Sequence, residues 1–321
     1  MDKLYDLTIY SFPNDSDRDW SSIGLFTSFG EALRTAEEYL NDVPGFCDYY
    51  CEPEIIAVPV IGSEDPREVW RFIGWNADKN GGETDIIESD CYVSQQLAHT
   101  NLEQIQKTMP RQEWTLNRWI IGERHWQDGF IREYPDGRKA PTLREIRTVL
   151  KEAMDSRKLV KIEFHYADYD RFFFPLAVGE KLFLCAEEND FLLDGFTVRR
   201  IRDVEHIEPR EGMYSEIMQY EGWLDNLKTP NVDISDWHGL FRSLEQLGQN
   251  IIVEEEHLDD DSCFAIGAIA AVGQDHILLH RFDSEGIWDD QPIKIAYDDI
   301  TSVSFGTRYI NIFSKYLTPR N

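Results

Sequence analysis

The chain contains two stretches in which a helical stripe of apolar residues is followed by five short apolar runs. In the first stretch, the stripe begins behind a capping box formed by Thr142 and Glu145. Its apolar positions lie three or four residues apart, as on one face of a helix: Leu143, Ile146, Leu150 and Met154. The runs that follow have the length of strands and lie at 160–166, 172–176, 182–186, 196–198 and 204–207. Because a sheet needs its apolar face covered, this pattern predicts a helix packed on a small five-stranded barrel.

The second stretch repeats this order. Its helical stripe ends before Gly248, a residue typical of a helix C-cap, and consists of Trp237, Leu240, Phe241, Leu244 and Leu247. Strand-length runs follow at 251–253, 264–269, 277–279, 293–295 and 301–305. The repetition predicts two closed barrels in tandem, at 141–209 and 235–318. We expect a docked connecting helix at 210–234, because a free linker would not carry so many large apolar side chains.

The first part of the chain, residues 1–138, predicts a separate α+β domain. A strand alternates around Leu7 and Ile9, and a helix begins behind a second capping box, Ser28 to Glu31. After a strand at 54–61, the order of strand, helix and strand returns between Trp70 and Ile120. We therefore expect an internal duplication of this unit. The fold class predicted for the whole chain is α+β.

Composition favours a folded cytoplasmic protein. The 321 residues are 42% hydrophobic and include 9 Trp, 14 Tyr and 18 Phe, far more aromatic residues than disordered chains contain. No signal peptide or apolar run of membrane-spanning length is evident. The five cysteines are sparse and odd in number, which suits a reducing compartment better than a disulfide framework.

The net charge of −28 limits the choice of partners. Residues 1–140, 141–230 and 231–321 contribute −13, −5 and −10, so no segment is basic. Phosphate binding needs a basic surface, which argues against nucleic acid as a partner. Either the negative charge only keeps the protein soluble, or it forms an acidic face that attracts a basic protein.

Motifs for catalysis and for metal binding are weak. The chain has no Gly-x-Ser-x-Gly, phosphate loop or dinucleotide fingerprint. His276 and His280 are four residues apart, but on the expected strand they lie too far from each other to share one zinc ion. Cys47 and Cys51 have no second ligand pair, and His125 has no readable nucleophile beside it. We expect no catalytic residues, no metal and no cofactor.

The first barrel stretch resembles the WYL domain of bacterial regulators, and both stretches resemble Sm-like, SH3-type barrels. The likeness rests on four segments of this chain: Arg157-Lys158-Leu159-Val160-Lys161-Ile162, Phe174-Pro175-Leu176, Leu182-Phe183-Leu184 and Phe196-Thr197-Val198-Arg199-Arg200-Ile201. Leu182 and Phe183 stand where that family has its Trp-Tyr pair. The N-terminal part and residues 286–311 resemble uncharacterised bacterial modules. These resemblances imply a bacterial source and a fold, and they imply no reaction.

Two groups of residues are candidate binding sites. By the WYL resemblance Arg200 corresponds to an arginine that helps to hold an anionic ligand, so the candidate ligand-binding residues are Phe183, Arg199, Arg200 and Arg202. If all three arginines lie on a strand, Arg200 and Arg202 share a face and Arg199 points the other way. The alternative is that these arginines pair with nearby acids such as Asp203 and Glu205.

The second group is the acidic run that follows the first strand of the second stretch. Its candidate partner-binding residues are Glu254, Glu255, Glu256, Asp259, Asp260 and Asp261. The alternative for this run is a solvated hairpin, because it lacks the glycine and the spaced ligands of a calcium loop.

These features favour a non-enzymatic interaction protein. The leading hypothesis is an acidic bacterial protein that binds a basic protein, of which immunity-type neutralisation of a toxin or effector is one form. The second hypothesis is a WYL-like sensor that holds a small anionic ligand against Arg200. An enzyme of unknown class is the third.

Overall fold

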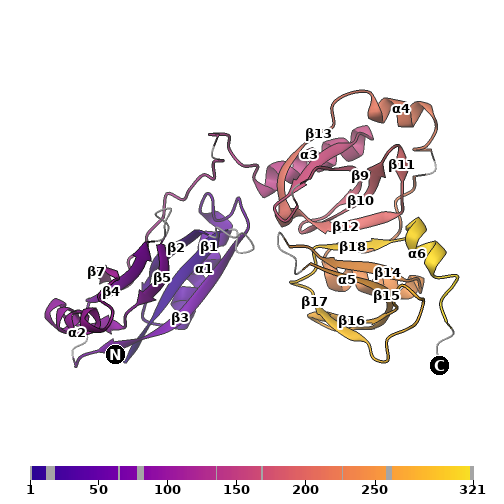
Figure 1. The fold of residues 1–321 in the computed structure, drawn as a ribbon. Coiled ribbons are helices and arrows are strands. Elements are labelled where there is room, and N and C mark those ends of the chain that lie inside the picture. The colour runs from indigo at the N-terminus through magenta and orange to yellow at the C-terminus, as the bar shows by residue number, and fades with distance from the viewer. Residues whose placement is uncertain are drawn as a thin grey trace. The chain divides into compact units, whose positions relative to one another are not determined.

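The computed structural model describes residues 2–11, 19–63, 66–77, 83–134, 136–167, 169–225, 227–257 and 262–318. The chain divides into two compact units, Met1–Arg132 and Glu133–Asn321. Each unit combines helices with a largely antiparallel sheet (Figure 1), which confirms the predicted α+β class. Within the described residues, no helix is both long enough and apolar enough to cross a membrane.

Unit 1 is built from two similar halves. The first contains β1 (Lys3–Ser11), β2 (Asp19–Phe26), α1 (Phe29–Asp42) and β3 (Cys51–Ile61). The second contains β4 (Glu68–Ala77), β5 (Glu83–Glu88), β6 (Cys91–Tyr92), α2 (Gln95–Thr108) and β7 (Glu113–Ile120). In each half the first strand is central: β1 pairs antiparallel with β2 and β3, and β4 pairs antiparallel with β5 and β7. Short pairings of β6 with β3 and β4 join the halves into one sheet.

Both helices of unit 1 begin at a serine. The side chains of Ser28 and Ser94 each accept a hydrogen bond from the backbone N–H three residues further on, as N-caps do. The predicted capping box at Ser28 is only half formed, because the Glu31 carboxylate accepts instead from the Thr27 hydroxyl.

Unit 2 begins with a helix, α3 (Leu143–Ser156), whose predicted capping box at Thr142 and Glu145 is present. The strands and turn that follow are β8 (Val160–Phe164), β9 (Arg171–Val178), β10 (Leu182–Asn189), β11 (Leu192–Leu193), β12 (Phe196–Arg200), a 3-10 turn (Ile201–Asp203) and β13 (Val204–Pro209). After α4 (Tyr214–Tyr220), the second half consists of α5 (Trp237–Leu247), β14 (Ile251–Glu255), β15 (Cys263–Val272), β16 (His276–Arg281), β17 (Ile293–Ala296), β18 (Ser302–Phe305) and α6 (Arg308–Phe313).

The two halves of unit 2 share a strand order and one sheet. The first half runs β13-β8-β9-β10-β12, with the two-residue β11 paired to β10 off this path, and the second runs β18-β14-β15-β16-β17. Each half therefore has a helix followed by five strands in this order, and the last strand pairs with the first. β12 and β18 pair antiparallel from Phe196↔Phe305 to Arg199↔Ser302 and lie side by side in Figure 1. The sheet therefore passes from one half to the other, and separate closure into two barrels is not confirmed. Pairing with each other gives β12 and β18 partners for their open edges.

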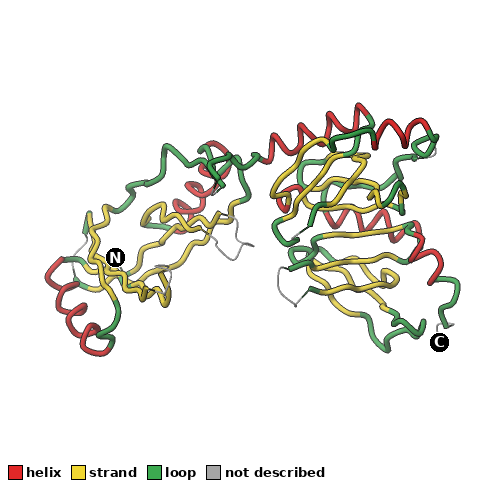
Figure 2. Tube along the Cα trace, turned by 45° about the horizontal axis from the view of Figure 1, so that its top comes forward, coloured by secondary structure: helices red, strands yellow, loops and turns green. Residues whose placement is uncertain are grey.

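This junction buries β10 and β12 on both faces. Phe183 and Cys185 face a core beneath α3, whereas Leu182, Leu184 and Val198 belong to a core that contains α5. In Figure 2, α5 can be followed against the strands of both halves. Burial on two faces explains why β10 begins with a continuous apolar run rather than an alternating one.

The segment between the halves of unit 2 contains a short helix that packs against the first half. The connecting helix α4 covers only Tyr214–Tyr220, within the longer stretch expected at 210–234. Its Met218, together with Leu224 in the following turn, packs into a small core with Leu159 and Phe174.

Gly195 lies where the two halves of unit 2 approach each other closely. Its φ is +70°, and a Cβ added there would lie 2.6 Å from the backbone nitrogen of Thr307 and 2.7 Å from the carbonyl oxygen of Phe305. We predict that Gly195→Ala lowers the free energy of unfolding by about 2–4 kcal/mol, through backbone strain and the clash together. Gly248→Ala is the matched control, because Gly248 has a φ of +63° with open space around it. The control should cost about 1 kcal/mol, and equal losses in urea unfolding would contradict the close approach.

Candidate functional site

Arg199 lies at the junction of the two halves, and its side chain is only 1% exposed. Its guanidinium donates to the Glu256 carboxylate at 2.7 Å and to the Tyr166 hydroxyl at 3.0 Å. The same carboxylate accepts from Arg171 at 2.6 Å. A single glutamate of the second half thus bridges two arginines of the first.

The pKa values of this cluster keep both partners charged. Burial alone would lower the pKa of Arg199, but Tyr166 and Glu256 outweigh it, and the net direction is upward. Burial alone would raise the pKa of Glu256, yet Arg199 and Arg171 bring it below its ordinary value of 4.5. Burial also raises the pKa of the Tyr166 hydroxyl. The cluster is an internal ion pair, with Arg199 committed to Glu256.

The other predicted ligand-binding residues are also engaged within the protein. Arg200 donates to the Asp203 carboxylate at 2.6 Å and to the Asp298 carbonyl at 2.7 Å, a second contact between the halves. The strand ends at Arg200, and Arg202 lies in the 3-10 turn. The expectation that Arg200 and Arg202 share a strand face is therefore wrong. Phe183 is fully buried in the core beneath α3.

The acidic run is used partly at the junction. The Glu254 carboxylate accepts from the Ser302 hydroxyl at 2.5 Å, and Glu256 binds the arginines. Glu255 is half-buried, and burial and Asp299 raise the pKa of its carboxyl. The remaining predicted residues, Asp259, Asp260 and Asp261, lie outside the described residues.

The residues considered for catalysis or metal binding have structural contacts. His125 accepts a hydrogen bond on its backbone carbonyl from the Tyr39 hydroxyl at 2.5 Å, and its ring packs edge-on against Trp119. His276 and His280 lie on β16, as expected, and a ring nitrogen of His280 lies 2.6 Å from the Asp289 carbonyl. Across the residues placed by the structure, no three His, Cys, Asp or Glu side chains form a metal-binding group.

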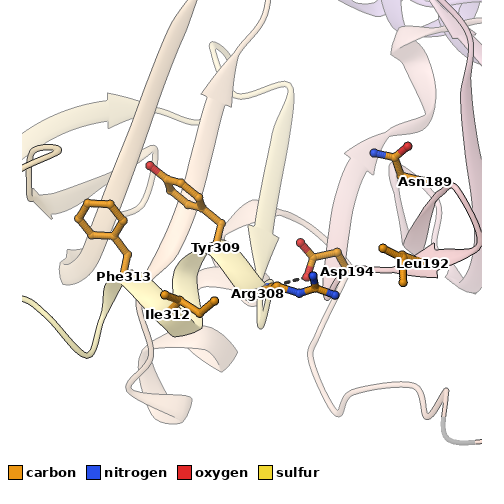
Figure 3. A pocket seen from close by; sticks show the side chains of 7 residues that line it. All are labelled: Asn189, Leu192, Asp194, Arg308, Tyr309, Ile312 and Phe313. Carbon is orange, nitrogen blue, oxygen red and sulfur yellow. Dashed lines mark hydrogen bonds between the residues drawn. The ribbon is translucent and has the colours of Figure 1, made fainter.

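A groove of about 460 Å³ opens between the β10–β11 hairpin and α6 (Figure 3). Its lining combines apolar and polar side chains: Asn189, Leu192, Asp194, Arg308, Tyr309, Ile312 and Phe313. The Asp194 carboxylate accepts a hydrogen bond from the Arg308 backbone N–H at 2.5 Å, which places the start of α6 against the hairpin. The sequence analysis missed this groove, because its two sides are more than a hundred residues apart and no motif links them.

The lining of the groove has the features of a binding cleft. Its size lies in the range of ligand-binding clefts, and apolar walls with a few polar groups are typical of such sites. Among the described residues, the one carboxylate in the lining, that of Asp194, accepts from the Arg308 backbone N–H. Leu192, Tyr309 and Ile312 are exposed there, so apolar surface is available to a bound molecule.

The contribution of the buried Arg199–Glu256 ion pair to stability can be tested by truncating Arg199. We predict that Arg199→Ala lowers the free energy of unfolding by about 3–5 kcal/mol, because it leaves the Glu256 carboxylate buried without its main partner. Arg242→Ala removes an arginine from an exposed pair with Glu245 at 3.2 Å and should cost less than about 1 kcal/mol. Denaturant titration of the full chain measures both. A loss for Arg199→Ala as small as that for Arg242→Ala would rule out the junction role.

No family model matches the chain, and neither a curated protein nor a solved structure matches it.

Proposed function

We propose that the chain is a non-enzymatic, acidic interaction protein that binds a basic protein partner, with immunity-type neutralisation as one form of that role. The observation that carries the proposal is the carboxylate excess that remains after internal pairing. The chain has 60 acidic and 32 basic side chains. Its buried arginines, among them Arg71, Arg199 and Arg200, are paired with internal carboxylates.

The surface around Lys161 illustrates this excess. Its ammonium lies 3.3 Å from Glu163, 3.2 Å from Asp170 and 3.4 Å from Glu208. One positive charge there faces three negative charges, so the local surface stays acidic. Fields of this kind attract oppositely charged proteins over long distances.

The state of these thiols is consistent with a role without a cysteine nucleophile. Burial raises the pKa of the Cys51 thiol to about 11 and that of Cys91 to about 12. A nucleophilic cysteine needs the opposite shift, because the thiolate is the reactive form.

We predict a partner whose association depends strongly on salt. A pull-down from the native cell at low ionic strength should recover a basic protein, and its purified form should associate more slowly as salt is added. The slowing follows from the screening of exposed charges. Recovery of no basic partner at low ionic strength, or an association rate insensitive to salt, would overturn the proposal.

Binding of a small anionic ligand is the second candidate function. The repeated strand order of unit 2 favours it, since tandem helix-led barrels, the first WYL-like, would give that order. In such a sensor Arg200 would contribute to anion binding while keeping its bond to the Asp298 carbonyl.

Thermal-shift measurements test this alternative. If a nucleotide or another small anion binds the folded chain, its addition should raise the melting temperature with increasing concentration. The increase should disappear in Arg200→Ala and persist in Arg242→Ala. A melting temperature that no anion raises, or an increase unchanged in Arg200→Ala, would count against the sensor.

A further inference from the structure

An exposed apolar patch lies on the outer side of the first half of unit 2. We define the aromatic patch by six exposed residues of the β10–β11 hairpin and the α4 region: Leu192, Met213, Tyr214, Ile217, Tyr220 and Trp223. Tyr220 is 91% exposed and Met213 69%. Tyr, Trp and Met are the residue types enriched in the cores of protein–protein interfaces.

The small core beneath α4 does not bury these side chains. The inner side of α4 is already packed, through Met218, and Leu224 fills the same core from the next turn. Met213, Tyr214, Ile217, Tyr220 and Trp223 of the same segment remain exposed to solvent. Tyr220 and Met213, the two most exposed, gain little from folding, because burial is what makes an apolar side chain stabilising.

The rings of the patch are held in place. Phe191 stacks on Tyr214 with ring centroids 5.6 Å apart and meets Trp223 edge-on at 6.4 Å. The Arg210 guanidinium lies 3.5 Å from the centroid of the Tyr214 ring and pairs with Glu188. A surface ordered in advance loses less conformational entropy when a partner binds.

The hairpin that supports the patch has an unusual backbone. Asp190 and Phe191 have φ values of +49° and +63°, a conformation that favours glycine or asparagine at such turns. The Phe191 N–H donates to the Glu188 carboxylate at 2.6 Å, which helps to hold this turn. Phe191 thus occupies a strained position in which its ring contacts Tyr214 and Trp223.

Exposed carboxylates lie on the same segments as the aromatic patch. Five acidic residues of the same segments are exposed: Asp190, Glu211, Glu216, Glu221 and Asp225. Within the part of the chain that the structure describes, none of these five forms an ion pair. Exposed apolar side chains interspersed with acidic ones complement a surface that has apolar side chains among lysines and arginines.

We propose that the aromatic patch is the docking surface for a basic protein segment that carries apolar side chains. The inference rests on the proposed function and adds the face of the molecule and the chemistry of the partner. Leu192 belongs both to the patch and to the groove beside α6 (Figure 3), so a segment longer than the patch would continue into that groove.

A pair of synthetic peptides tests the proposal on the full-length protein. The first is an amphipathic helix of leucine and lysine, and the second has the same lysines with serine in place of every leucine. Fluorescence anisotropy at low ionic strength measures both dissociation constants. The leucine peptide should bind about tenfold or more tightly than the serine peptide, because only it has apolar side chains for the patch.

Substitutions locate the binding site. Tyr220→Ser and Trp223→Ser should each substantially weaken binding of the leucine peptide. The double variant should bind the leucine peptide only as tightly as the unaltered chain binds the serine peptide. Phe264→Ser is the matched control, because Phe264 is an exposed ring (51%) on β15, outside the patch, and this variant should bind as the unaltered chain does. Tyr220→Ser keeps the test interpretable if Trp223→Ser unfolds, because Tyr220 is almost fully exposed. The double variant Glu216→Gln, Glu221→Gln should bind both peptides more weakly.

The outcomes separate the two proposals. If the peptides bind equally, or if Tyr220→Ser and Trp223→Ser bind the leucine peptide unchanged, the docking surface is wrong while salt-sensitive binding of both peptides still supports the proposed function. If neither peptide binds the unaltered chain at low ionic strength, the proposed function fails as well.

Discussion

The arrangement of unit 2 depends on one buried charge. Arg199 lies where β12 pairs with β18, at a point where no water is available to solvate a guanidinium. A buried charge without a partner is strongly destabilising, so the Glu256 carboxylate of the second half must reach it. That requirement determines the register of the junction, because a slip of one residue would turn Arg199 to the opposite face of the sheet. Arg200, bonded to the Asp298 carbonyl, adds a second link of the same kind.

Internal pairing also shapes the outer surface. The guanidinium groups of Arg199 and Arg71 are buried. The Arg199 group joins the halves of unit 2, and the Arg71 group pairs with Asp6 and Glu88 in unit 1. The carboxylates in excess remain outside, where they generate a negative field. The stability of the junction and the proposed attraction of a basic partner therefore both depend on how the few cations are distributed.

The segment between the halves meets two separate demands. Its inner residues close a small core with Leu159 and Phe174, which docks α4. Its outer residues form the aromatic patch, in which Phe191 and Arg210 order the rings of Tyr214 and Trp223. Folding explains the first set through burial. The second set is the docking surface proposed above for a partner with apolar and basic side chains.

Local signals in the sequence determined most of the elements. The spacing of apolar residues and the caps at Thr142 and Gly248 predicted α3 and α5 correctly, because these features act within a few residues of the chain. The repeated order of helix and strands was readable for the same reason. Only the tertiary structure decided that β12 pairs with β18, that Arg199 binds Glu256, and that the hairpin at Leu192 meets α6 to form a groove. Those contacts join residues about 60 to 120 positions apart, and their energies come from desolvation and edge pairing, which no local pattern of side chains encodes.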